Sequence, residues 1–361
     1  MSVVFASPLD ERLQAAGGVP AEYHGQTLAR HFGDPHGEYV AATEGAAIFD
    51  RSHRTRLLVR GRSPRQMLNG VLTGTLPKPP EARAPGILGG TATYHAVLTP
   101  KGKMITDLWC LCRHEDETGG DFLLDVPVAG RDGLLAHLGK FLPPRLAAVA
   151  DVRQEVASVS VVGPGAAAHV SRLALGLRVE EGEVAGLVEG AWLLSGSFPD
   201  GGVAVTRTAE VWPPAYTLYG PAPSLASLWT AFVGAGVTPA GLGVWSTLRV
   251  EAGRPAYGTD MDENTIPVEA GIHDRAIDYG KGCYTGQEVI VRIRDRGHVN
   301  RNLRQLLLGD VPAPPRGAPL FVEGTEKPVG EVTSAVQSPR FGQTVALGYV
   351  KRGVEGNPRL G

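Results

Sequence analysis

The 361-residue sequence predicts an α+β protein of more than one domain. Several segments in the first 150 residues alternate apolar and polar side chains and end at glycine, proline or charged residues, which is typical of strands. These segments are residues 55–61, 93–98, 104–114 and 121–127. Between them, residues 63–72 and 129–142 carry apolar side chains at three- and four-residue spacing, which indicates helices. Strands interleaved with short helices favour an α+β fold over a strictly wound parallel sheet.

The second half of the chain repeats this pattern. We expect a strand at residues 158–163, a helix at 163–176 and another at 224–236. Residues 75–90 are rich in proline and glycine and predict a long loop. The proline-rich stretch 310–319 leads to short strands with regular turns, which suggests a small C-terminal β-barrel.

The length suggests two to three domains, at roughly 150 residues each. We expect α+β domains at residues 1–150 and 151–245, a motif segment at 246–309 and a barrel at 310–361. We expect the first domain, residues 1–150, to bind the ligand.

Charge and cysteine content exclude several classes of partner. The sequence has 35 basic and 37 acidic residues, so no overall field draws it to nucleic acid or membrane, and any anion site must be local. Three cysteines do not make a disulfide framework. The sequence shows neither a secretory signal nor a run of ~18 apolar residues. We therefore expect a cytoplasmic, monomeric protein.

One cysteine occupies an unusual setting, KGCYTGQE at residues 281–288. A cation such as Lys281 near Cys283 would favour a thiolate, and a helix opening at Gln287 and Glu288 would favour an anion there. Gly282 and Gly286 would allow close approach to a ligand. A functional thiol and an inert turn both remain open on this evidence.

Two further clusters have competing interpretations. Cys110, Cys112 and His114 would share one face of a strand, but they lack an evident fourth metal ligand, and buried structural cysteines are common. Residues 291–304 contain five arginines, Arg292 among them, and form either a solvated face or a local site for a phosphate or carboxylate. We expect no metal centre.

KGCYTGQE and the basic, glycine-containing stretch after it resemble the motif of the YgfZ-type folate-binding proteins. These are relatives of the glycine cleavage T-protein, an aminomethyltransferase. The similarity continues through most of the chain. It extends to residues 45–61, 98–108, 245–271 and 329–339.

Three features resemble the YgfZ branch more than the T-proteins. They are the intact motif, the stretch RTAEVWPP at 207–214 in place of a glycine-rich one, and Trp245. Asp107 aligns instead with the catalytic aspartate of T-proteins, so one-carbon chemistry remains open.

The resemblance implies a three-part, ring-like aminomethyltransferase fold with tetrahydrofolate in a central channel. A flat pterin needs an aromatic wall, for which Trp245 and Tyr94 are candidates, and a carboxylate to accept from its N–H groups, for which Glu269 and Asp107 are candidates. Arg292 could hold the glutamate tail. The motif residues Gly282, Tyr284, Gly286, Gln287 and Glu288 are further candidates for folate binding.

The resemblance implies a tetrahydrofolate-binding accessory protein that supports iron–sulfur cluster assembly or repair, with Cys283, Lys281 and Asp107 as candidate catalytic residues. Iron–sulfur client proteins or assembly factors would be its partners. The alternative is an aminomethyltransferase of glycine cleavage. A thiol hydrolase is a third interpretation. It would need His273 or His298 beside Cys283 as a general base, and no such arrangement follows from the spacing.

Overall fold

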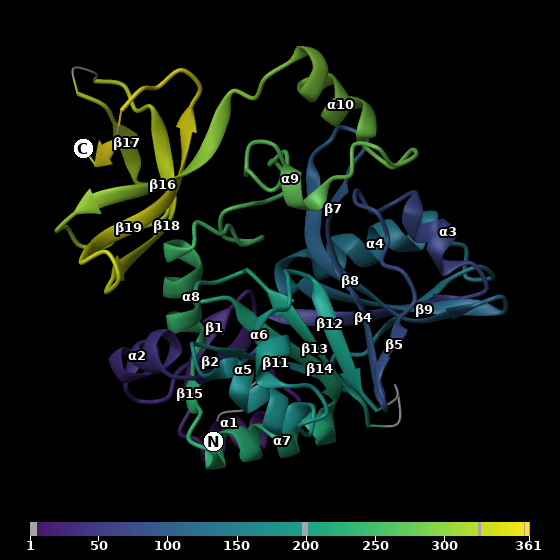
Figure 1. The fold of residues 1–361 in the computed structure, drawn as a ribbon. Coiled ribbons are helices and arrows are strands. Elements are labelled where there is room, and N and C mark those ends of the chain that lie inside the picture. Colours follow the sequence, from purple (N-terminus) through teal and green to yellow (C-terminus); the bar gives the residue numbers. More distant parts are fainter. Residues whose placement is uncertain (1–5, 197–200, 324–325, 357, 361) are drawn as a thin grey trace.

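An eight-stranded sheet gathers strands from distant parts of the chain (Figure 1). The structure is a computed structural model that describes residues 6–196, 201–323, 326–356 and 358–360. The strand order is β15-β3-β11-β14-β13-β12-β6-β5, and only the β15–β3 pair is parallel. The strands are β3 (Ala47–Asp50), β5 (Glu81–Ala84), β6 (Ile87–Thr91), β11 (Val156–Val162), β12 (Ala191–Ser195), β13 (Val203–Thr208), β14 (Ala215–Pro221) and β15 (Thr238–Ala240).

Helices cover one face of this sheet. One buried apolar cluster joins the helices to Val161 of the sheet. The helices contribute Leu13, Val170, Val184 and Trp229 to it. The helices are α1 (Asp10–Ala15), α5 (Ala166–His169), the π-helix η2 (Val170–Ala174), α6 (Glu181–Ala185) and α7 (Ala222–Gly234). The predicted helix at 163–176 is therefore a short α-helix followed by a π-helical turn.

A five-stranded antiparallel sheet, β10-β4-β9-β8-β7, packs against the other face of the first sheet. Trp109 and Leu123 meet Trp192 and Tyr219 across this interface, while α3 and α4 cover the outer face. The elements are β4 (Arg54–Gly61), β7 (Thr93–Leu98), β8 (Met104–Asp116), β9 (Gly119–Pro127), β10 (Ala148–Asp151), α3 (Pro64–Asn69), η1 (Val128–Gly130) and α4 (Arg131–Phe141). The predicted strands and helices of this region are confirmed.

The chain ends in a separate C-terminal unit (Figure 1). That unit is a curled five-stranded half-barrel in the order β16-β19-β18-β17-β20. Its strands are β16 (Arg301–Gly309), β17 (Pro319–Phe321), β18 (Gly330–Ser338), β19 (Gln343–Lys351) and β20 (Arg359–Leu360). The other elements are the hairpin β1 (Val19–Tyr23) and β2 (Gln26–His31), with α2 (Pro35–Glu44), α8 (Leu242–Glu251), α9 (His273–Ala276) and α10 (Gln287–Arg296). The predicted α+β class and small C-terminal barrel are confirmed.

One predicted loop is wrong in part. Residues 75–90 include β5 and most of β6, because Ile87–Thr91 pairs with Ala191–Ser195 of β12, a partner about 100 residues later in the chain. The domain boundary at residue 150 remains a prediction. Strands β3, β5 and β6 from before it lie in the same sheet as strands from after it.

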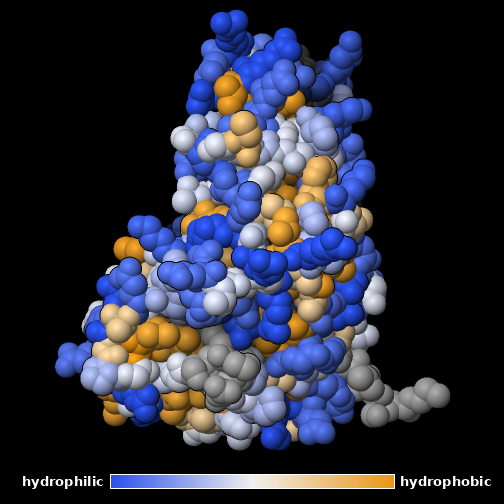
Figure 2. Space-filling model, turned by 90° about the vertical axis from the view of Figure 1, so that its right-hand side faces the viewer, coloured by the Kyte–Doolittle hydropathy of each residue, from blue (hydrophilic) through white to orange (hydrophobic). Residues whose placement is uncertain are grey.

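The surface is mostly polar on the face drawn in Figure 2, where hydrophobic residues gather in small patches among hydrophilic ones. Among the residues that the structure describes, no helix is long and apolar enough to cross a membrane.

Candidate functional site

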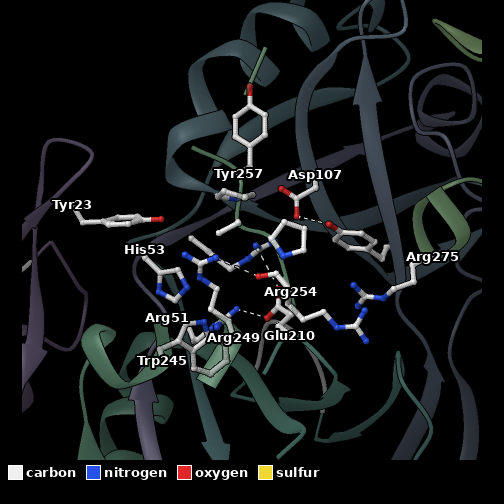
Figure 3. Close-up of a pocket in the computed structure, with 15 residues that line it drawn as sticks. Tyr23, Arg51, His53, Asp107, Glu210, Trp245, Arg249, Arg254, Tyr257 and Arg275 are labelled. Carbon is white, nitrogen blue, oxygen red and sulfur yellow. Dashed lines mark hydrogen bonds and ion pairs between the residues drawn. The ribbon is translucent and has the colours of Figure 1, made fainter. Parts of the chain in front are cut away.

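A cavity opens where the two large sheets, α8 and the loop after α8 meet (Figure 3). Asp107, Tyr94 and Trp245, three of the residues singled out in the sequence, line it together. The other lining residues are Tyr23, Arg51, His53, Arg54, Pro127, Glu210, Arg249, Arg254, Pro255, Ala256, Tyr257 and Arg275. The fold thus brings together aromatic rings, two carboxylates and several guanidinium groups.

Trp245 forms an aromatic wall of the cavity from α8. Its side chain is buried, and the Arg51 guanidinium carbon lies 3.9 Å from the ring centroid. Phe49 meets the ring edge-on at a centroid distance of 5.3 Å. These contacts fix the orientation of the indole, because a cation over one face and a ring at the edge both match its quadrupole.

Asp107 and Tyr94 come from neighbouring strands, β8 and β7. The Tyr94 hydroxyl donates a hydrogen bond to Asp107 Oδ2 at 2.8 Å. Asp107 Oδ1 is buried and has no hydrogen-bond partner among the described residues. Burial raises the pKa of this carboxyl, although Arg54 and the Tyr94 hydrogen bond oppose that shift. A buried carboxylate oxygen without a donor can accept a hydrogen bond from a ligand N–H group.

Buried arginines surround Glu210 on the other side of the cavity. Its Oε2 lies 2.5 Å from Arg51 Nη2, and its Oε1 lies 3.6 Å from Arg54 Nη1. Trp109 Nε1 also donates to Oε1, at 3.3 Å. Burial acts to raise the pKa of Glu210, but the charges of Arg51 and Arg54 outweigh it and lower the pKa. Glu210 is therefore held as a carboxylate.

His53 lies among the same arginines and faces Trp245 at a ring distance of 6.0 Å. Burial, and then the charges of Arg51, Arg54 and Arg56, lower its pKa well below the usual value. The imidazole is therefore neutral at physiological pH, and it can accept or donate a hydrogen bond without adding charge.

The sequence reasoning missed several lining residues, among them Arg51, His53, Arg54 and Glu210. One signal was present: strand β4 opens with RTRLLV, in which Arg54 and Arg56 lead into an apolar run, and both arginines are buried there. Buried arginines are rare unless they are paired, so such a pattern indicates a built polar site. Glu210 lies in the stretch RTAEVWPP, which carried no local signal of its own.

Lys281 does not line the cavity and instead binds backbone carbonyl groups. Its Nζ donates to the carbonyl oxygens of Asn69, Leu72 and Gly74 at 3.0, 2.7 and 3.0 Å. Burial lowers the pKa of Lys281 to about 8. Three acceptors match the three N–H donors of an ammonium group, so Lys281 ties the motif to the segment after α3.

The rest of KGCYTGQE forms an outer loop that leads into α10. Cys283 and Gly282 are exposed, Tyr284 is buried, and Gly286 adopts a φ of 85° with Thr99 O only 2.6 Å from where a Cβ would stand. Gln287 and Glu288 begin α10, as expected. None of the motif residues lines the cavity, and their proposed roles in folate binding and catalysis remain predictions.

Glu269 and Arg292 also lie outside the cavity. Glu269 Oε2 accepts from Arg301 Nε at 3.4 Å, beside the C-terminal half-barrel. Arg292 is exposed on α10. His273 and His298 line a separate groove with Arg294 and Arg352, and Cys283 is not part of it. The predicted roles of Glu269 and Arg292 towards folate stay predictions.

The cysteines of CLCRH belong to the core. Cys110 and Cys112 are buried in the cluster beneath α3 and α4, and burial raises the pKa of both thiols. The strand register shifts between Cys112 and His114, and His114 pairs with Asp116 on the surface at 3.0 Å. Across the described ranges, no cluster of three or more His, Cys, Asp or Glu residues could hold a metal.

Comparison with known proteins gives two family matches that together span most of the chain. Residues 9–281 match the GCVT N-terminal domain, and residues 301–358 match the glycine cleavage T-protein C-terminal barrel domain. Residues 282–300, with Cys283 and α10, fall between the two matches.

Two curated relatives are named aminomethyltransferase. One, from Rubrobacter xylanophilus, is 29% identical over 351 residues and covers 97% of this chain and 88% of the relative. Another, from Geobacillus kaustophilus, is 29% identical over 358 residues and covers 96% of this chain and 91% of the relative.

The solved structure of the glycine cleavage system aminomethyltransferase T from Bartonella henselae superimposes with a TM-score of 0.79. That match has 22% sequence identity and covers 97% of this chain and 91% of the other. The expected aminomethyltransferase fold is thereby confirmed. The two domain matches, taken together with this fold, show that the chain belongs to the glycine cleavage T-protein family.

Proposed function

We propose that this chain binds tetrahydrofolate in the cavity around Asp107 and uses it in aminomethyl or related one-carbon transfer. Tetrahydrofolate is the cofactor of this family's aminomethyltransferases. The relatives named aminomethyltransferase favour this function over the iron–sulfur role that the motif suggested. The observation that carries the proposal is the buried, unpartnered Oδ1 of Asp107 in a cavity walled by Trp245.

The cavity suits a reduced pterin on chemical grounds. The ring system is flat and partly apolar, which suits the walls offered by Trp245, Tyr94 and Tyr257. The amino and ring N–H groups of the pterin are hydrogen-bond donors. Asp107 Oδ1 is an acceptor to which no described residue donates. Asp107 would orient the pterin, and tetrahydrofolate would supply the nitrogen that receives the one-carbon unit.

Two measurements test this function. Titration with tetrahydrofolate should quench tryptophan fluorescence saturably, since Trp245 and Trp109 lie in or beside the cavity. Incubation with an aminomethylated lipoyl carrier protein and tetrahydrofolate should release ammonia. Binding without ammonia release would exclude aminomethyl transfer from this carrier, and absence of saturable binding would overturn the proposal as a whole.

A second candidate function is the accessory role in iron–sulfur cluster assembly or repair. It is favoured by one observation: Cys283 is exposed, outside the cavity, in a segment that neither family match covers. Replacement of Cys283 by alanine should then impair iron–sulfur enzyme activities in cells lacking the native gene, while the purified variant binds tetrahydrofolate as the wild type does. Full complementation by the variant would remove this candidate.

A further inference from the structure

Two arginines converge at one end of the cavity. Arg254 follows α8 in the loop of residues 253–257, and Arg275 belongs to α9. Both line the cavity, and Figure 3 shows their guanidinium groups pointing toward one another at the end away from Trp245. Glu189 pairs with Arg275 and also acts on Arg254, so this end of the cavity holds two guanidinium groups around one protein carboxylate.

The charge balance of the cavity singles out Arg254. The other lining arginines pair with carboxylates: Arg51 with Glu210, Arg54 with Asp125, Arg249 with Asp260 and Arg275 with Glu189. Arg254 donates from Nε to the carbonyl oxygen of Ala209 at 2.9 Å and forms no ion pair with a carboxylate of the described residues. Burial, and then the neighbouring charge of Arg275, lower its pKa. Among the described residues, Arg254 is thus the lining arginine without a carboxylate at ion-pair distance, and Glu189 and Glu210 act on it only from further away.

Arg275 stands on the boundary of the cavity. Its guanidinium lies over the Tyr94 ring, with Cζ 4.8 Å from the centroid, and its buried Nε finds no partner in the part of the chain that the structure describes. Arg275 and Tyr94 also line a second, outer pocket with Thr75, Trp109 and Asp278. A ligand group held between the two arginines would thus lie where the cavity meets this pocket.

We propose that Arg254 and Arg275 form a carboxylate-binding subsite at the end of the folate cavity. A planar guanidinium matches a carboxylate in a two-point hydrogen-bonded arrangement, and Arg254 pairs directly with no carboxylate of the described residues. The subsite rests on the proposed function, and it adds a ligand class to it. The carboxylate belongs either to the glutamate moiety of tetrahydrofolate or to a separate small substrate in the outer pocket.

Binding measurements on variants test the subsite. Arg254→Gln removes the unpaired charge, Arg254→Lys keeps the charge without the planar fork, and the exposed Arg62→Gln is the matched control. Three probes are titrated: tetrahydrofolate, a tetrahydropterin that lacks the p-aminobenzoylglutamate, and acetate added to protein saturated with that pterin. Thermal melting of each variant checks that it is folded.

The expected result identifies the source of the carboxylate. If it comes from folate, Arg254→Gln should bind tetrahydrofolate about 10- to 100-fold more weakly, the value of a charged hydrogen bond, and the tetrahydropterin equally well. If it comes from a second substrate, Arg254→Gln should lose acetate binding and keep both pterins. In either case Arg254→Lys should bind the carboxylate probe more weakly than wild type, and Arg62→Gln should match wild type.

A substitution of Glu189 should strengthen carboxylate binding, the opposite of the effect expected for Arg254→Gln. Glu189→Gln removes the carboxylate that pairs with Arg275, so the affinity for the carboxylate probe should rise several-fold. The subsite is overturned if Arg254→Gln and wild type bind all three probes alike, or if Glu189→Gln weakens carboxylate binding. A wild-type protein that binds acetate but not tetrahydrofolate would refute the proposed function and leave the subsite standing.

Discussion

The Tyr94 hydroxyl occupies one oxygen of Asp107 and leaves the other free inside the cavity. The bond joins Tyr94 on β7 to Asp107 on the adjacent β8, two positions away from direct register. The tyrosine thereby fixes the plane of the carboxyl group, so that Oδ1 has a defined direction before any ligand arrives. Such preorganisation lowers the entropy that a ligand must lose on binding.

Asp107→Asn should separate ligand binding from stability. The amide can turn an NH₂ group toward the ligand donor or offer a weaker acceptor, so tetrahydrofolate affinity should fall about 10- to 100-fold. Burial raises the pKa of Asp107, so the folded state disfavours its charge. The free energy of unfolding of the neutral variant at pH 7 should therefore equal or exceed that of the wild type. Fluorescence titration and urea unfolding measure the two effects.

The pH dependence of binding supplies the control for this variant. Wild-type affinity should decline as the pH falls through the raised pKa of Asp107, above its ordinary value of 3.8, because the protonated carboxyl no longer offers two acceptor oxygens. Asp107→Asn should lack this component of the pH profile. An unchanged affinity in Asp107→Asn would contradict the assignment of Oδ1 as the ligand acceptor.

Glu210→Gln should destabilise the folded protein. Arg51 is 1% exposed and Arg54 is 6% exposed, so loss of the Glu210 charge leaves buried guanidinium groups undercompensated. We expect a loss of about 3 kcal/mol in the free energy of unfolding at pH 7, measured with urea. The matched control is Glu115→Gln, whose partner Arg65 is 35% exposed, and it should cost less than about 1 kcal/mol.

The ion pairs of Glu210 with Arg51 and Arg54 also predict how stability changes in acid. The pKa of Glu210 is lowered in the folded state, so its contribution is present above its ordinary value of 4.5 and is lost as the pH falls through the lowered pKa. The difference in unfolding free energy between wild type and Glu210→Gln should therefore shrink below pH 4.5. A difference that stays constant between pH 7 and pH 3 would contradict this electrostatic account.

Sequence reasoning reached the fold and part of the site. Short apolar segments bounded by glycine, proline or charged residues were enough to predict β4, β7, β8 and β9, whose residues are mostly buried because the sheet is covered on both faces. Strand β6 was missed, since its glycines and threonine gain strand geometry from pairing with β12, far along the chain, and with the short strand β5. Asp107 and Trp245 were identified through the family resemblance. Arg254 lies in a loop, and only the tertiary fold brings it into the cavity beside Arg275.

Lys281 shows the same limit for the motif. Its nearness to Cys283 in sequence suggested a cation that activates a thiol, yet its ammonium group binds carbonyl oxygens more than 200 residues away. Thr285 N adds a further hydrogen bond to Gly70 O at 3.0 Å. Local sequence cannot reveal which distant carbonyls converge on a side chain, so the structural role could be seen only in the fold.

Lys281→Ala should therefore loosen the motif from the body of the protein. Three carbonyl acceptors would lose their donor, and we expect the free energy of unfolding to fall by about 2 kcal/mol. Amide hydrogen exchange should quicken in residues 69–75 and 278–286. The exposed Lys101→Ala is the control and should stay within about 0.5 kcal/mol of wild type.

Alkylation of Cys283 distinguishes this role from thiol activation. If Lys281 acted as a charge that stabilises the thiolate, Lys281→Ala would slow the reaction of Cys283 with a small alkylating reagent and leave stability and exchange unchanged. If it anchors the loop, stability and exchange protection fall together, and the alkylation rate holds or rises because Cys283 is already exposed. Slower alkylation with unaltered unfolding would overturn the anchoring role and return Lys281 to the chemistry of the thiol.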